Sequence, residues 1–132
     1  MFVFWLDNKT GVPPYLQLVQ QVQHAVVLGY LQPGDQLPLI RDVVGRLAIN
    51  PNTVSKAYQR LEQEGLVTAR PGVGTFVAER ASSPPVPPAT HTTLRQGLER
   101  WLRSAHAAGL NEAAITALVA TARRELGAEG AA

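Results

Sequence analysis

The chain has 132 residues, 45% of them hydrophobic, which suits one ordinary domain or a small domain with an appendage and permits a buried core. It contains no cysteine, so disulfides and thiolate zinc sites are excluded, and the composition fits a reducing cytoplasm. The N-terminal residues lack the pattern of a secretory signal, and the apolar runs are too short to span a membrane. The net charge of +2 only weakly indicates an anionic partner, so the positions of the basic residues matter more than their number.

The first 30 residues predict an apolar segment, a turn and an amphipathic helix. Residues 2–6 are apolar and β-prone, so they either form a short strand or pack onto the body of the protein. After a turn at residues 8–12, the helix is expected to open at Pro13 and Pro14 and to end near Gly29. Helical spacing gives this helix an apolar inner face and a polar outer face: Leu16, Val19, Val22, Val26 and Tyr30 inside, and Gln17, Gln20, Gln21, Gln23 and His24 outside.

Two further helices are expected next in the chain. The second covers about residues 39–47, and the third begins at Asn50 and Pro51 and runs to about Glu64. Asparagine can cap the free amide groups at a helix start, and proline in the first position has no amide to satisfy. Gly65 then ends the third helix. The inward residues of the second helix are Ile40, Val43, Val44 and Leu47.

The remaining chain predicts a hairpin, a linker and two more helices. Strands at residues 66–70 and 75–78 flank the glycine-rich tip 71–74, because glycine supplies the positive φ that such turns need. Residues 81–93 contain four prolines and are expected to form an extended linker. The last two helices are expected at residues 94–108 and 112–126, the first ended by Gly109 and the second capped by Asn111.

This order of elements predicts a mainly α-helical fold. Three helices followed by a β-hairpin describe a winged helix-turn-helix, in which the hairpin is the wing. We expect this DNA-binding domain over residues 1–80, a linker over residues 81–93 and a two-helix dimerisation tail over residues 94–132.

The third predicted helix has one apolar face and one hydrogen-bonding face. Val54, Ala57, Tyr58 and Leu61 share the face to be buried, and the opposite face carries side chains suited to base edges in a major groove. The free amides at the helix start should attract phosphate, and the wing should lie along the adjacent backbone or minor groove. The alternative is a merely solvated face, or a winged helix that binds protein and not DNA. The candidate DNA contacts are Arg41, Asn50, Asn52, Thr53, Ser55, Lys56, Gln59, Arg70, Gly72, Gly74 and Thr75.

Linked motifs between residues 8 and 79 resemble the DNA-binding domain of the GntR family of regulators; they lie at residues 15–17, 33–38, 50–54, 64–66 and 72–77. The resemblance implies a transcription regulator, most often a repressor, that binds a roughly palindromic operator as a homodimer. It also places DNA contacts at Arg41, Asn52, Thr53, Ser55, Lys56 and Gly72. The chain departs from the family at Leu39, Val44 and Ala48, where serine, alanine and glycine are usual. Loss of the serine removes a helix cap worth about 1 kcal/mol.

The short tail predicts self-association. It resembles the tail of the YtrA subfamily, whose two helices are thought to dimerise. One helical hairpin cannot bury both of its apolar stripes, so a second copy is the natural partner; the alternative is that the tail folds back onto the winged domain. The predicted dimerisation residues are Leu94, Leu98, Trp101, Leu102, Leu110, Ile115, Leu118, Val119 and Ala122, with Ala105 and Leu126 in the same stripes.

No catalytic, metal or cofactor site is expected. His24, His91 and His106 are far apart in the chain and show no i, i+4 pairing for a metal. The glycine-rich tip lacks the lysine and the spacing of a phosphate-binding loop. The sequence therefore predicts a protein that is not an enzyme, and it identifies no effector.

Overall fold

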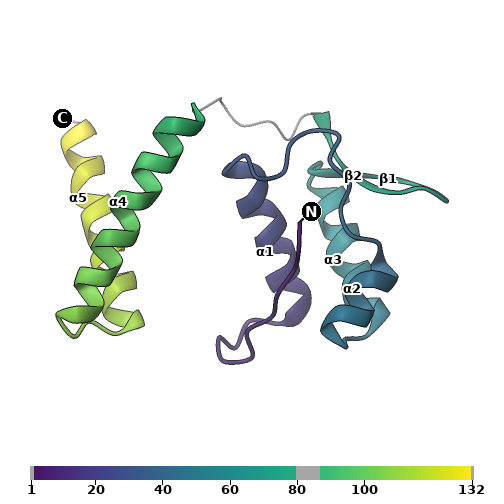
Figure 1. The fold of residues 1–132 in the computed structure, drawn as a ribbon, viewed down its shortest axis with the longest axis horizontal. Helices are drawn as coiled ribbons and strands as arrows, with labels where there is room; N and C mark the ends of the chain where they lie inside the picture. The colour runs from purple at the N-terminus through teal and green to yellow at the C-terminus, as the bar shows by residue number, and fades with distance from the viewer. Residues whose placement is uncertain (1, 80–86, 132) are drawn as a thin grey trace. The chain divides into compact units, whose positions relative to one another are not determined.

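The computed structural model describes residues 2–79 and 87–131, and the chain forms two compact units, Met1–Pro84 and Pro85–Ala132 (Figure 1). The first unit contains three helices and a hairpin: α1 (Pro14–Val27), α2 (Ile40–Leu47), α3 (Pro51–Gln63), β1 (Val67–Arg70) and β2 (Gly74–Val77). The second unit contains α4 (Pro88–Ala107) and α5 (Glu112–Ala131). The predicted fold class, mainly helical with a β-hairpin wing, is confirmed.

The core of the first unit lies between its three helices. Each helix contributes buried side chains, and the segments before α1, before α2 and in the hairpin close the edges, so the helices and the wing share one core. The buried hydrophobic residues of this core are Phe4, Leu18, Val19, Val22, Ala25, Val26, Leu31, Leu37, Val43, Val54, Ala57, Tyr58, Leu61, Val67 and Val77.

The N-terminal segment packs along α1 and forms no strand (Figure 1). Phe4 is buried while Val3 and Trp5 are exposed, which is the alternation of an extended chain. The side-chain amide of Gln21 accepts a hydrogen bond from the backbone N of Trp5 (3.1 Å) and donates one to its carbonyl (2.7 Å). Because a side chain of α1 satisfies this backbone, the segment needs no partner strand.

Two predictions for α1 are wrong. Gln17, expected on the outer face, is only 8% exposed, because its amide accepts a hydrogen bond from Asp7 N and donates to the carbonyls of Asp7 and Val12, all at 2.9 Å. Tyr30, expected on the inner face, is 51% exposed, because the helix ends three residues earlier and Gly29 (φ +79°) redirects the chain. Helical spacing predicts orientation only within the helix, and it does not foresee a neighbouring segment that covers the outer face.

α2 lacks favourable residues at both of its ends. Leu39 occupies the N-cap position, and the structure gives this helix start no side-chain hydrogen bond. Ala48 follows the last turn with φ 53° and ψ 47°, in the left-handed region. An L-residue in that region loses roughly 1–2 kcal/mol to the clash between Cβ and the carbonyl oxygen. The two departures from the family pattern at Leu39 and Ala48 therefore each fall on a helix end where the usual residue would be more stable.

α3 and the hairpin form largely as predicted. The Oδ1 atom of Asn50 accepts a hydrogen bond from the backbone N of Asn52 (2.8 Å), and Pro51 is the first helical residue. β1 and β2 pair antiparallel, with Val67 opposite Val77, and both of these valines are buried against the core. The hydrophobic contacts of one strand pair thus fix the wing to α3.

In the second unit the predicted helix boundaries need correction. α4 begins at Pro88, six residues before the expected position 94, because proline is tolerated in a first helical turn. The predicted linker over residues 81–93 is therefore wrong for residues 88–93, and its residues 81–86 lie outside the described residues. The Oδ1 atom of Asn111 accepts a hydrogen bond from Ala114 N (2.8 Å), as expected of a cap, but α5 runs on to Ala131 and not to residue 126. Helix propensity does not explain this extension, because Gly127 and Gly130 lie within it. Within the described residues, no helix is both long and apolar enough to cross a membrane.

Candidate nucleic-acid interface

The buried face of α3 is the predicted one. Val54, Ala57, Tyr58 and Leu61 are all buried. The Tyr58 hydroxyl donates a 2.6 Å hydrogen bond to the carbonyl of Pro38, and burial holds the pKa of Tyr58 well above its ordinary value. This hydrogen bond ties α3 to the segment that leads into α2, so the two helices keep a fixed relation to each other.

The opposite face of α3 points to solvent. Asn52, Lys56 and Gln59 are exposed, and Thr53 and Ser55 on its flanks are partly exposed. These side chains carry amide, ammonium and hydroxyl groups of the reach that contacts base edges in a major groove. The structure therefore leaves the predicted polar face of α3 available to a partner.

The amides at the start of α3 differ from the expectation. Pro51 has no N–H, the N–H of Asn52 is bonded to the side chain of Asn50, and the N–H of Thr53 is bonded to the carbonyl of Asn50 (3.0 Å). The side chain of Asn50 is consequently engaged as a helix cap. The amides of Asn52 and Thr53 at this helix start are therefore already engaged within the chain.

The second group of candidate residues lines an open groove between α2 and the wing. This groove has a volume of about 560 Å³. Its walls come from residues 38–41 and 69–75 together with Tyr58, so it brings together five of the predicted contacts: Arg41, Arg70, Gly72, Gly74 and Thr75. The side chain of Arg41 is 83% exposed, and its Nε lies 4.0 Å from Asp42 Oδ1. Two arginines at one open groove suit an anionic backbone.

Gly74 has a backbone conformation that favours glycine, and it leaves room for a side chain beside the wing. A Cβ on Gly74 would lie 2.5 Å from Nε2 of Gln36, and the residue has a φ of +150°. The same Gln36 amide approaches the carbonyl of Val73 at 3.4 Å. Glycine at this position therefore lets Gln36 contact the wing from the segment before α2.

Sequence reasoning missed the aromatic partners of two cations. The Nζ atom of Lys56 lies 3.9 Å from the ring centroid of Tyr15, and the guanidinium carbon of Arg70 lies 4.4 Å from that of Phe76. Such contacts stabilise a cation by roughly 0.5–1 kcal/mol at exposed sites and restrict its rotamers. The Lys56–Tyr15 pair joins two helices, so no spacing in the sequence reveals it, whereas Arg70 and Phe76 are diagonal neighbours in the predicted hairpin.

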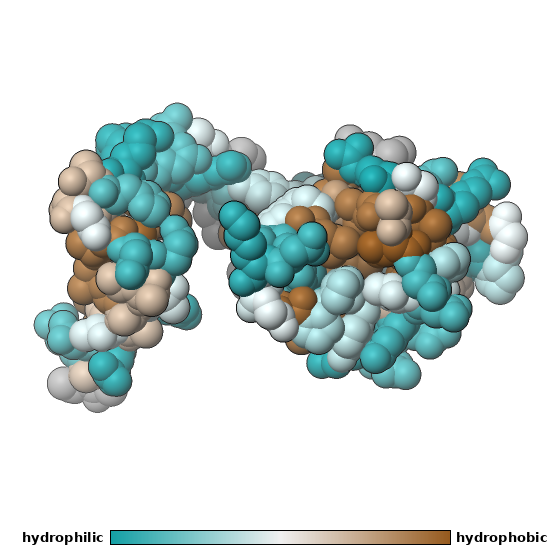
Figure 2. All heavy atoms as spheres, turned by 90° about the horizontal axis from the view of Figure 1, so that it is seen from below, coloured by the Kyte–Doolittle hydropathy of each residue, from teal (hydrophilic) through white to brown (hydrophobic). Residues whose placement is uncertain are grey.

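The predicted dimerisation residues are mostly exposed within one chain. Ala105 and Ile115 are buried between α4 and α5, and Leu102 and Leu110 are partly buried. The other predicted residues, Leu94, Leu98, Trp101, Leu118, Val119 and Ala122, are exposed. Figure 2 shows hydrophobic surface on this two-helix unit. Contiguous exposed apolar surface of this kind usually marks an interaction site.

The histidines form no metal site in the described part of the chain, where no group of three His, Cys, Asp or Glu side chains could hold a metal ion. His106 lies 3.7 Å from the carboxylate of Glu112, across the turn between α4 and α5.

Three helices, a two-stranded wing and an exposed polar face on the third helix define the winged helix-turn-helix class of regulators. The sequence pattern of the bacterial regulatory proteins of the gntR family matches residues 14–77. The transcriptional repressor YtrA of Bacillus subtilis is 36% identical over 105 residues, which is 80% of each chain. The chain belongs to the GntR family, and its similarity to YtrA extends beyond the winged unit.

Solved structures support the same assignment. A transcriptional antiterminator from Listeria monocytogenes superimposes with a TM-score of 0.59 at 33% identity, covering 92% of this chain and 90% of the other. YtrA from Sulfolobus acidocaldarius, a GntR-family transcription factor, superimposes with a TM-score of 0.52 at 30% identity, covering 75% of this chain and 96% of the other.

Proposed function

We propose that this protein is a cytoplasmic, non-enzymatic transcription repressor that binds a palindromic operator as a homodimer. The observation that carries the proposal is the two-sided character of α3. Its apolar side is buried in the core through Val54 and Tyr58. The orientation of its polar side, which carries Asn52 and Gln59, is therefore fixed relative to the rest of the unit. A rigid helix with exposed amide side chains can enter a major groove and form bidentate contacts with adenine.

The groove between α2 and the wing supports a second group of proposed contacts, which would bind the DNA backbone beside α3. Arg41 and Arg70 line this groove and would contact phosphates, and Gly72 at the tip would allow close approach of the main chain to DNA. Base contacts from α3 would supply specificity, and these flanking contacts would supply affinity and orientation.

The homodimer rests on the exposed apolar residues of α4 and α5. A two-fold symmetric pair of tails would bury side chains such as Leu98 and Val119, and it would present two recognition helices to two half-sites. Burial of these residues against the winged unit of the same chain is the competing arrangement. The prolines of residues 81–87 favour an extended connection over a folded-back tail, so we favour the symmetric pair.

A DNase footprint on the DNA upstream of the protein's own gene tests the proposal. We expect a protected site with two-fold symmetry, and an affinity that falls with salt with a slope of about −0.9 per phosphate neutralised. Absence of protection, or duplex binding that ignores salt, would favour a winged helix that binds protein and not DNA.

A further inference from the structure

The edge of α3 that faces α1 carries a row of charged side chains. Lys56, Arg60 and Glu64 follow one another at intervals of four residues, so they share one edge of the helix. α1 contacts both ends of this row: Tyr15 lies under the ammonium of Lys56, and the Gln23 amide donates a 2.7 Å hydrogen bond to Glu64 Oε1. The two contacts are eight residues apart on each helix, so α1 and α3 run side by side in the same direction.

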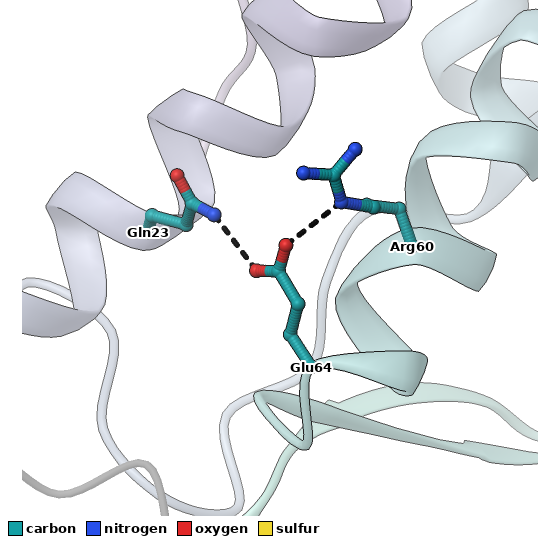
Figure 3. Close-up of polar contacts among 3 residues, drawn as sticks. All are labelled: Gln23, Arg60 and Glu64. Carbon is teal, nitrogen blue, oxygen red and sulfur yellow. Dashed lines mark hydrogen bonds and ion pairs between the residues drawn. The ribbon is translucent and has the colours of Figure 1, made fainter.

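Arg60 is oriented by this arrangement. Its Nε donates to Glu64 Oε2 at 2.9 Å, while the other carboxylate oxygen is held by Gln23. Figure 3 shows Glu64 between the two residues, with the two terminal nitrogens of Arg60 pointing away from the carboxylate. The hydrogen bonds from Gln23 and Arg60 lower the pKa of Glu64, so this carboxylate stays charged at neutral pH. The Arg60 side chain is nevertheless 47% exposed.

We propose that Lys56 and Arg60 form a phosphate-binding row on the α1-facing edge of α3, and that Tyr15 is a positioning residue for Lys56. The Asn52 and Gln59 face would enter the groove, and this edge would lie against the backbone of one DNA strand. A guanidinium with two free terminal nitrogens can bind a phosphate through two parallel hydrogen bonds. The inference rests on the proposed function and deepens it, because it adds Arg60 and Tyr15 to the DNA interface.

The test of this row is a salt titration. The affinity of each variant for a duplex that contains the footprinted operator is measured between about 50 and 200 mM salt. Because each of the two subunits of the bound dimer loses one phosphate contact, Arg60→Ala should lower the magnitude of the salt slope by about 1.8 and weaken binding roughly 60-fold at 0.1 M salt. Arg60→Lys should keep the slope, because the charge remains. Arg46→Ala is the matched control: it removes the same charge from an exposed arginine of α2, beside the N-terminal segment, and should change the slope much less.

The role of Tyr15 is tested with variants that remove or keep its aromatic ring. Tyr15→Leu should weaken operator binding roughly two- to fivefold per subunit of the bound dimer, the usual range for an exposed cation–π contact. Tyr15→Phe keeps the ring and should bind like the wild type, and Tyr15→Leu should have no further effect once Lys56 is alanine. Circular dichroism is the control that checks whether each variant is folded.

The outcomes separate this inference from the proposed function. If the wild-type protein does not bind duplex DNA, the proposed function itself is wrong. A wild-type protein that binds with a steep salt slope, together with an Arg60→Ala slope equal to that of Arg46→Ala, would overturn the row alone. Equal losses of operator affinity in Tyr15→Phe and Tyr15→Leu would overturn the positioning role of the ring.

Discussion

Replacing Ala48 by glycine is expected to stabilise the first unit. Ala48 has a left-handed conformation (φ 53°, ψ 47°) after the last turn of α2, and its side chain is exposed. Glycine removes a steric penalty of roughly 1–2 kcal/mol. It also raises the entropy of the unfolded chain, which opposes folding by roughly 0.5–1 kcal/mol. The net gain is about 0.5–1 kcal/mol, or roughly 2–8 °C in Tm for a domain of this size.

Urea denaturation followed by tryptophan fluorescence measures this gain. Trp5 belongs to the first unit and Trp101 to the second, so a Trp101→Phe background makes the signal report on the first unit. Wild type and variant are compared at one protein concentration, because self-association would otherwise shift the midpoint. The midpoint should rise without a change in slope.

Gly65→Ala is the matched reverse exchange. Gly65 has a φ of +79° at the end of α3, and an added Cβ would meet nothing within 4 Å. The variant should therefore lose about 1 kcal/mol from backbone conformation alone. If Gly65→Ala is destabilised as expected and Ala48→Gly is unchanged or less stable, the strain assigned to Ala48 is refuted.

Three other expectations concern the cap, the buried tyrosine and the tail. Asn50→Ala should lower the free energy of unfolding by about 1 kcal/mol, because it removes the cap of α3; wild-type stability in this variant would show that the cap is dispensable. Tyr58→Phe should cost about 1 kcal/mol by leaving the Pro38 carbonyl without its 2.6 Å hydrogen bond. Because burial raises the pKa of Tyr58 above its ordinary value of 10.0, wild-type stability should fall as pH rises beyond 10.0, and the fall should be smaller in Tyr58→Phe; equal falls would contradict this. Leu98→Glu should convert a dimer to monomers in sedimentation, whereas the exposed neighbour change Gln96→Glu should not; a dimer in both would place the interface elsewhere.

Local patterns were sufficient to predict the elements that form the proposed interface. The apolar spacing of Val54, Ala57, Tyr58 and Leu61 sets the orientation of α3, and Asn50 with Pro51 sets its start. The same logic placed the wing, because the glycines at its tip are a local signal.

Features that depend on contacts between distant segments could not be predicted in this way. Gln17 is buried because the chain around Asp7 folds back over α1, and Lys56 meets a ring from another helix. The early start of α4 at Pro88 was missed because proline fits both an extended linker and a first helical turn. The sequence offers Asn50 both as a helix cap and as a DNA contact; the structure shows the cap, and the DNA contact stays a prediction.

The most direct test of the account is the operator affinity of Asn52→Ala and Gln59→Ala, compared with Gln32→Ala, which removes an exposed amide outside α3. We predict that the two α3 variants each lose roughly 1–3 kcal/mol of binding to the operator, with little change for a scrambled duplex, and that Gln32→Ala binds like the wild type. Folded α3 variants that both keep wild-type affinity for the operator would contradict the claim that this face recognises DNA.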